Sequence, residues 1–238
     1  MSESARSTPA QAILLDIEGT TTPIAFVYET LFPYARAHLK SFLDAHASHA
    51  DGAALIERLR RDKTMDAEAP AGGSVVEYVE WLMDRDRKST ALKELQGLIW
   101  EDGYRRGELT GEIFPDVAPA LERWHRQAIG AGIFSSGSVL AQRRLFGHST
   151  AGDLTPLLRW YFDTTTGSKR DHASYDRIAR SMGLPADAIV FVSDVVEELD
   201  AAREAGMQTR LSLRPGNAPQ PAGHGHRPVR GFDELDFR

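Results

Sequence analysis

Five short apolar runs alternate with segments of helical spacing, and this alternation is the strongest constraint on the fold of the 238-residue chain. Short apolar runs bounded by turn residues are typical of fully buried strands. The predicted strands are Ala12–Leu15, Ala131–Phe134, Trp160–Phe162, Ile189–Val192 and Thr209–Leu213. The predicted helices between them are Val117–Gln127, Ser138–Phe146, Ser174–Met182 and Val196–Ala205. The pattern predicts an α/β fold with a doubly wound, parallel, Rossmann-like sheet.

One long stretch interrupts the alternation. Between the first and second predicted strands the sequence has helical spacing and no strand pattern, which indicates an inserted helical domain. The helices expected there are Val27–Ala47, with Pro33 as a kink or as its true start, Ala53–Arg61, Val75–Arg85 and Leu92–Tyr104. We therefore assign residues 1–23 and 112–238 to the core and residues 24–111 to the insertion. Residues 1–11 are expected to be a disordered lead-in. The segment after Pro215 is expected to be irregular, with the closing GFDELDF docking as a short element.

Charge and composition exclude several classes of function. The net charge of −6 offers no broad basic face for a nucleic acid, and no apolar run reaches the length that spans a membrane. The chain has no cysteine, so disulfides and thiolate chemistry are excluded. The polar N-terminal segment lacks the apolar centre of a signal peptide. We expect a cytoplasmic protein with a small-molecule partner.

Polar residues occur where four of the predicted strands end. These residues are Asp16 with Glu18, Ser135 with Ser136, Lys169, and Asp194. In a doubly wound sheet, ligands bind at the carboxyl ends of the strands, so these side chains should face one crevice. Carboxylates suit a nucleophile and a divalent cation, whereas hydroxyl, amide and ammonium groups suit phosphate oxygens.

Each of these residues also has a structural alternative. Asp16 could cap the turn that follows it, and Asp194 could cap the next helix. Ser136 or Ser138 could cap a helix in the same way, and a lysine after a Gly-Ser turn, such as Lys169, is usually solvated. The joint occurrence at four strand ends favours the functional interpretation.

The strings that carry these residues resemble a known superfamily. DIEGT after the first strand, SS after the second, Lys169 and Asp194 resemble the four motifs of the haloacid-dehalogenase superfamily, and the insertion resembles its helical cap. The longer strings LLDIEGTTTPIAFVYETLFPYAR and SSGSVLAQRRLFG resemble the enolase-phosphatase (acireductone synthase) family of methionine salvage. That family also has glutamate at the position of Glu18, where the superfamily usually has aspartate. The resemblance covers roughly Ile13 to Leu213.

The resemblance implies a magnesium-dependent phosphoric monoester hydrolase. Its substrate would be 2,3-diketo-5-methylthiopentyl-1-phosphate, which is enolised and then dephosphorylated to the acireductone. One Mg²⁺ per chain would be held by Asp16, Glu18 and Asp194, and the substrate phosphate by Ser135, Ser136 and Lys169. Asp16 would form an aspartyl-phosphate, with Glu18 as acid and base and Lys169 as a catalytic positive charge.

Several alternatives stay open on the sequence alone. The enolisation base is either Glu18 or a residue of the insertion. The nearest alternative function is a capped phosphatase of another small phosphorylated metabolite, such as phosphoglycolate. A dehalogenase on the same fold would not need the charged pair Glu18 and Asp194, and a receiver-like signalling module would lack the insertion. We expect a monomer.

Overall fold

The computed structural model describes residues 8–85, 87, 89–221, 223–235 and 237. The chain divides into two compact units, one formed by Met1–Val27 with Thr110–Arg238 and the other by Tyr28–Leu109. Each unit has its own hydrophobic core. The sequence predicted domain boundaries between residues 23 and 24 and between residues 111 and 112. The assignment of the two parts as catalytic core and cap stays a prediction.

The first unit is built on a six-stranded sheet in which every neighbouring pair of strands is parallel. Its strands are β1 Ala12–Leu15, β2 Gly130–Phe134, β3 Leu158–Phe162, β4 Ile189–Ser193, β5 Gln208–Ser212 and β6 Arg227–Val229. They lie side by side in the order β3-β2-β1-β4-β5-β6. The predicted doubly wound α/β fold is confirmed.

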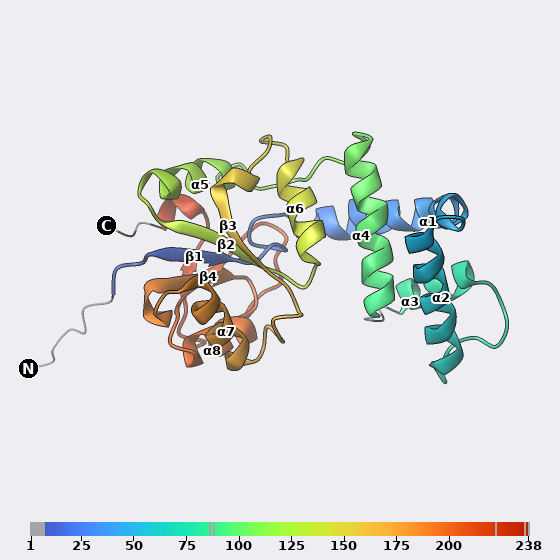
Figure 1. The fold of residues 1–238 in the computed structure, drawn as a ribbon. Coiled ribbons are helices and arrows are strands. Elements are labelled where there is room, and N and C mark those ends of the chain that lie inside the picture. Colours follow the sequence, from blue (N-terminus) through green and yellow to red (C-terminus); the bar gives the residue numbers. More distant parts are fainter. Residues whose placement is uncertain (1–7, 86, 88, 222, 236, 238) are drawn as a thin grey trace, which may run out of the picture. The chain divides into compact units, whose positions relative to one another are not determined.

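Helices cover both faces of this sheet (Figure 1). They are α5 Val117–Arg126, α6 Val139–Gly147, α7 His172–Met182 and α8 Val196–Glu204. Because alternate residues of a strand point to opposite faces, β1 is buried on both sides, and all four of its residues are inaccessible. Ala12 and Leu14 belong to the cluster that also contains α7 and α8, and α5 lies across the opposite face.

The strand order places a switch point between β1 and β4. The chain runs outward from β1 to β2 and β3, and then returns to the other side of β1 with β4. In open α/β sheets, ligands bind outside the carboxyl ends of the strands at such a reversal. Asp16 directly follows β1 and Asp194 directly follows β4. The topology therefore brings these two acids to the place where a ligand is expected.

Both ends of this unit are more ordered than the sequence predicted. In the lead-in, residues 1–7 lie outside the described residues, but Thr8 binds the side chain of Asp187, and Gln11 donates to the carbonyl of Ala188. The expectation of disorder is therefore wrong for residues 8–11.

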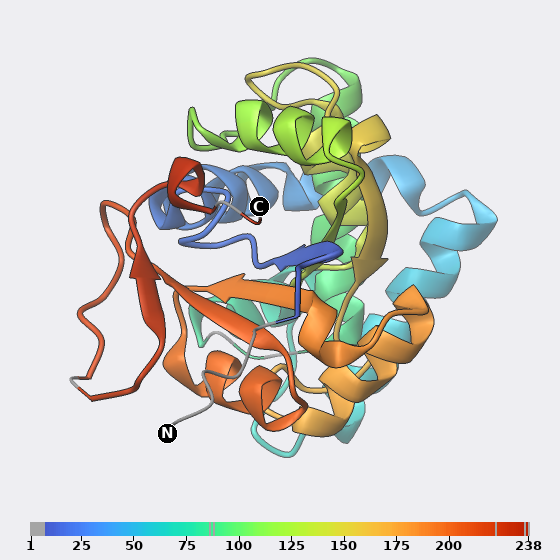
Figure 2. The ribbon, with the colours of Figure 1, turned by 90° about the vertical axis from the view of Figure 1, so that its left-hand side faces the viewer.

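The expectation of an irregular C-terminal segment is wrong in part. The segment forms β6, which pairs with β5 at the edge of the sheet (Figure 2). The closing GFDELDF docks as a short element, as predicted: it forms the 3₁₀ helix Phe232–Glu234, and the buried ring of Phe232 lies 5.6 Å from that of Trp124. Pro228 inside a three-residue strand is compatible with an edge position, where one missing donor costs little.

The second unit consists of helices α1 Phe32–His46, α2 Ala50–Met65, α3 Val75–Asp84 and α4 Thr90–Arg105. Their apolar faces form one core that includes Leu39, Leu59 and Leu95. Ser74 begins α3 with a reciprocal capping box to Glu77, which satisfies two backbone donors that a helix start leaves unpaired. The unit has no strand among its described residues, as predicted.

The start of the second unit differs from the predicted single helix Val27–Ala47. Residues Phe26–Leu31 form a π-helical segment, and α1 begins at Phe32 with Pro33 in its first turn. Proline is tolerated there because the first-turn N–H groups have no partner within the helix. The helical run nevertheless begins at residue 24 and continues through the π-helical segment into α1, so the prediction that Pro33 marks the true start of the whole run is wrong.

Candidate active site at the carboxyl ends of β1 and β4

Asp16 is buried at the end of β1, in a turn that folds back on itself. Its Oδ1 accepts a 2.7 Å hydrogen bond from the N–H of Ile17. The N–H groups of Thr21 and Thr22 both donate to the carbonyl of Ile17 at 2.9 Å. Gly19 turns the chain with a φ of +65°, which glycine adopts at no steric cost. The tight turn explains the need for a glycine three residues after the acid.

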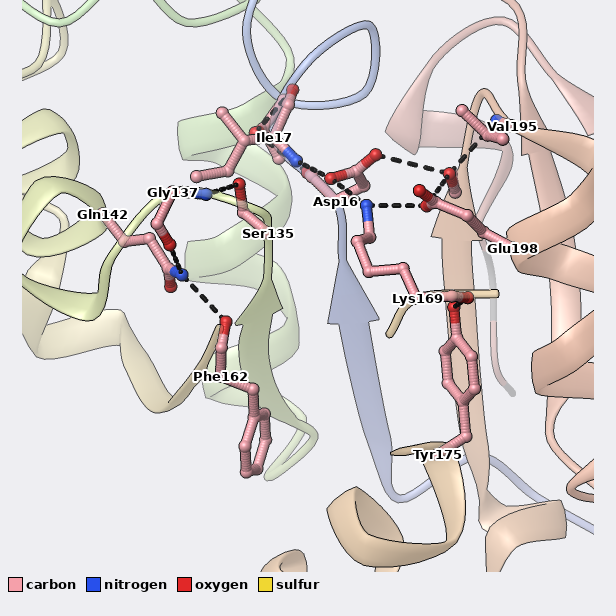
Figure 3. A network of polar contacts seen from close by, with 12 residues as sticks. Asp16, Ile17, Ser135, Gly137, Gln142, Phe162, Lys169, Tyr175, Val195 and Glu198 are labelled. Carbon is pink, nitrogen blue, oxygen red and sulfur yellow. Dashed lines mark hydrogen bonds and ion pairs between the residues drawn. The ribbon is translucent and has the colours of Figure 1, made fainter. Parts of the chain in front are cut away.

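Lys169 lies between two carboxylates, as Figure 3 shows. Its Nζ lies 2.7 Å from Asp16 Oδ1 and 2.6 Å from Glu198 Oε2, and its side chain is only 10% exposed. Burial alone would lower the pKa of this ammonium, but the charges of Asp16 and Glu198 outweigh burial and raise the pKa above its usual value. Lys169 is therefore a fixed positive charge beside Asp16, and its interpretation as a solvated loop residue is wrong.

Glu198 and Ser193 complete this network. The sequence leaves open whether Glu198 supports the metal site, and Ser193 was not among the predicted site residues. Ser193 Oγ lies 3.0 Å from Glu198 Oε2 and 3.4 Å from Asp16 Oδ2, and it accepts from the N–H of Val195 at 3.1 Å. Burial is the main cause that raises the pKa of Glu198 to about 7, and the charge of Asp16 adds to it. Glu198 lies one helical turn after Asp194, a spacing that is visible in the sequence. No sequence signal indicates Ser193.

Asp194 is buried close to Asp16 and does not cap α8, whose N-terminal cap residue is Val195. Burial raises the pKa of Asp194 to about 7, and the negative charges of Asp16 and, more weakly, Glu18 act in the same direction. A Cβ atom placed on Gly19 would lie 2.5 Å from Asp194 Oδ2, so the turn after β1 packs tightly against this carboxyl group. The surroundings of Asp194 thus disfavour the ionised form of its carboxyl group.

Ser135 is buried at the end of β2, the strand next to β1. Its Oγ accepts from the N–H of Gly137 at 3.2 Å, and its own N–H binds the carbonyl of Phe162. Gln142 supports this turn by donating to the carbonyls of Gly137 and Phe162 at 2.9 and 2.8 Å (Figure 3). The hydroxyl of Ser135 therefore keeps its proton available for another acceptor.

Ser136 and Ser138 differ from Ser135 in position. Ser136 is exposed. Ser138 is the N-cap of α6, and its Oγ accepts from the N–H of Ala141 at 3.2 Å. The helix-capping alternative therefore applies to Ser138, which leaves Ser135 and Ser136 in the turn between β2 and α6.

The comparisons with known proteins agree with this geometry. A family model described as haloacid dehalogenase-like hydrolase matches residues 10–206. Enolase-phosphatase E1 of Synechococcus elongatus is 50% identical over 94% of this chain and 96% of its own length. The chain belongs to the enolase-phosphatase family of haloacid dehalogenase-like hydrolases. The resemblance in the motifs is thereby confirmed.

Other members of the family cover the chain equally fully. Enolase-phosphatase E1 of Stenotrophomonas maltophilia is 48% identical over 95% of this chain and 99% of its own. Among solved structures, the UTR4 protein of Saccharomyces cerevisiae matches with a TM-score of 0.80 and 33% identity over 95% of this chain and 100% of that chain. Within the described residues, no helix is long and apolar enough to cross a membrane.

Proposed function

We propose that this chain is the enolase-phosphatase that converts 2,3-diketo-5-methylthiopentyl-1-phosphate to the acireductone and phosphate in methionine salvage. The proposal is carried by the ion pair of Asp16 and Lys169, which puts a carboxylate and a fixed positive charge together at the switch point. Relatives named enolase-phosphatase E1, at 45–50% identity over nearly the whole chain, support the choice of substrate.

Asp16 acts as the nucleophile. Lys169 and the N–H of Ile17 hold its Oδ1 at 2.7 Å each, whereas Oδ2 has a longer contact of 3.4 Å with Ser193. Oδ2 is therefore the oxygen that forms a bond to phosphorus while the ester P–O bond breaks. Glu18 gives a proton to the leaving oxygen and then takes one from the water that attacks phosphorus, which releases phosphate and restores the carboxylate.

The phosphate is bound next to this pair. The hydroxyls of Ser135 and Ser136, together with the ammonium of Lys169, contact the phosphate oxygens. Ser135 suits this role because Gly137 donates to its Oγ, so its own proton can point to the ligand. Lys169 also stabilises the charge that develops on the transferring group.

One Mg²⁺ per chain is held by Asp16, Glu18 and Asp194. A carboxylate and a negatively charged phosphate oxygen at about 4 Å repel by about 4 kcal/mol at an effective dielectric constant near 20. The positive charge of Lys169 alone cannot offset this repulsion, because the carboxylates of Asp16 and Glu198 already neutralise that charge. The metal supplies the remaining positive charge when it is bound.

Asp194 and its neighbour Asp16 provide part of a site for such an ion. Asp194 is a buried carboxyl that lies near other acids, and its pKa is raised to about 7 by burial and then by Asp16, so a cation beside it would relieve both effects. In the described part of the chain, no group of three His, Cys, Asp or Glu side chains is placed to hold a metal ion, so the structure does not bring Glu18 into one ligand set with Asp16 and Asp194. Mg²⁺ suits this arrangement, since it keeps several waters and commonly binds through one or two carboxylates plus substrate phosphate.

The helical unit Tyr28–Leu109 acts as the cap, and the protein works as a monomer in the cytoplasm. The separate core of this unit supports its assignment as an independent domain. Size-exclusion chromatography with light scattering tests the monomer, and a mass near 26.3 kDa is expected.

A direct assay tests the function. The purified chain is given the diketo phosphate with Mg²⁺, and both phosphate release and the absorbance of the enediol product are followed. We expect both signals to appear and to stop when a chelator is added. A panel of other phosphorylated metabolites, including phosphoglycolate, serves as the comparison. Absence of both signals, with turnover of a panel member, would assign the chain to another small phosphate.

A further inference from the structure

Three side chains at and after the end of β5 bind the turn that follows β1. The carbonyl of Gly19 accepts from Ser212 Oγ at 3.0 Å and from Asn217 Nδ2 at 2.9 Å. The carbonyl of Thr20 accepts from Arg214 Nε at 3.2 Å. None of these side chains belongs to the motifs recognised in the sequence. They fix the two residues that follow Glu18.

The side-chain amide of Asn217 has a defined orientation. Its Nδ2 donates to two carbonyl oxygens, those of Gly19 at 2.9 Å and Ser212 at 3.1 Å. Since a carbonyl can only accept, the nitrogen must face both of them and the amide oxygen must face away. That oxygen, Oδ1, is buried and has no hydrogen-bond partner. A buried acceptor without a partner is rare and destabilising, so it calls for an explanation.

The unpartnered oxygen lies next to Asp194. A Cβ atom placed on Gly19 would be 2.7 Å from Asn217 Oδ1 and 2.5 Å from Asp194 Oδ2, so both oxygens lie against the same side of Gly19. Both are acceptors. One water molecule in contact with both oxygens would satisfy the two together, because it can donate one hydrogen to each. A water that is also bound to a cation at Asp194 donates most strongly, since the metal polarises it.

We propose that Asn217 is a positioning residue of the metal site. Its amide nitrogen fixes Gly19, and with it the carboxyl-bearing residue Glu18, while its amide oxygen holds a water of the magnesium hydration shell beside Asp194. The inference rests on the proposed function only in requiring a divalent cation at Asp194. It accounts for both ends of this half-buried side chain with one role.

Ser212 provides a matched control. Its hydroxyl donates to the same carbonyl of Gly19, and this bond uses the one polar atom of its side chain. A purely structural role of Asn217 would therefore be shared by Ser212. A role toward the cation belongs to Asn217 alone.

The test is a calorimetric titration of Mg²⁺ into the metal-free full-length chain, which needs no turnover. Residues that support metal ligands typically contribute 10- to 100-fold in affinity, and we expect Asn217→Ala to weaken binding by at least about tenfold. Ser212→Ala should stay within about threefold of the unsubstituted chain. Thermal unfolding without metal should shift by similar amounts in both variants, since each loses hydrogen bonds to the same turn.

Asn217→Asp gives a second measurement, and it applies even if the alanine variant folds poorly. Aspartate keeps an oxygen beside Asp194 but loses the donor to Gly19. We expect it to bind Mg²⁺ at least as tightly as the unsubstituted chain while phosphate release falls.

The outcomes separate this inference from the proposed function. Equal Mg²⁺ affinity for Asn217→Ala and the unsubstituted chain, or equal losses in Asn217→Ala and Ser212→Ala, would overturn the inference. Failure of the unsubstituted chain to bind Mg²⁺ would overturn it as well. Normal Mg²⁺ binding without turnover of the diketo phosphate would instead remove the proposed substrate and leave the role of Asn217 intact.

Discussion

At the scale of single residues, the site contains more buried acid than buried base. Asp16, Asp194 and Glu198 are carboxyl groups with little exposure, and Lys169 is the ammonium placed among them. Buried charges are retained at such density only where they are paired or bind ions. The imbalance is the physical reason to expect a cation here.

Asp16→Asn tests the nucleophile. The amide is similar in size and can still occupy the place beside Lys169, but it does not form an acyl phosphate. We expect phosphate release to fall by more than about 10³-fold while the circular dichroism spectrum is retained. Asp233→Asn, at an exposed position in the C-terminal 3₁₀ helix, is the control and should keep full activity. Substantial residual turnover by Asp16→Asn would rule out carboxylate attack.

Glu198→Gln tests the second partner of Lys169. The change removes one of the two negative charges that raise the pKa of the lysine, so the lysine pKa should fall. We expect phosphate release to fall about 10- to 100-fold, and the alkaline limb of the pH–rate profile to move to lower pH. Glu197→Gln changes the exposed neighbour on the same helix and should do neither. Equal profiles for the two variants would contradict a role for Glu198.

At the residue scale, the sequence placed Asp16 directly after one strand and Lys169 in the loop beyond another. Asp16 and Lys169 were expected to share one crevice, and they form an ion pair. Asn217 could not be foreseen in the same way, because its partners are Gly19 and Ser212, and only the folded chain brings a turn near residue 217 to one near residue 19. Long-range backbone contacts of this kind leave no periodic pattern in a sequence.

At the scale of elements, the buried central strands were the easiest to predict. β1 and β4 are continuous apolar runs, and their predicted bounds agree with the structure to within one residue. β6 was missed because it has three residues, one of them proline, and depends on pairing with β5 for its existence. The π-helical segment Phe26–Leu31 was missed because its sequence has ordinary helical spacing.

The residue before β6 makes a prediction at this scale. His226 is inaccessible, with Nδ1 at 2.8 Å from Thr209 Oγ1 and Nε2 at 3.1 Å from Asp200 Oδ1. Burial is the main cause that lowers its pKa. The unfolded chain, with a histidine pKa of about 6.5, therefore takes up the proton first as the pH falls.

The contribution of His226 to the free energy of unfolding should thus be present above about pH 6.5 and be lost as the pH falls below it. Denaturant titrations between pH 7.5 and pH 5 would measure this slope. We expect His226→Gln to flatten it and His125→Gln, at an exposed position on α5, to leave it unchanged. A slope that persists in His226→Gln would assign the acid sensitivity to another group.

At the scale of the whole molecule, the site links metal binding to stability. Asp194 and Glu198 have pKa values raised to about 7 in the folded chain, above the ordinary carboxyl value of about 4. Without metal, the stability that their protonation provides is present at low pH and is lost as the pH rises through about 7. A cation that binds the ionised Asp194 should reverse this loss.

We therefore expect Mg²⁺ to raise the thermal midpoint of the metal-free chain more at pH 8 than at pH 6. At a concentration 100-fold above its dissociation constant, a ligand adds about 2.7 kcal/mol, which corresponds to roughly 5–10 °C for a chain of this size. Differential scanning calorimetry at the two pH values measures the difference. Asp194→Asn should remove the response, and an equal response in that variant would place the cation elsewhere.

The central position of β1 also has a consequence for how the chain folds. β1 pairs with β2 and β4, so residue 12 must meet residues 130 and 189 before the middle of the sheet exists. Closing such long loops costs entropy and slows folding, whereas the contacts among the four helices α1 to α4 all lie within residues 32–105. We expect these helices to acquire protection from amide hydrogen exchange first during refolding, and the turn that bears Asp16 to acquire it late.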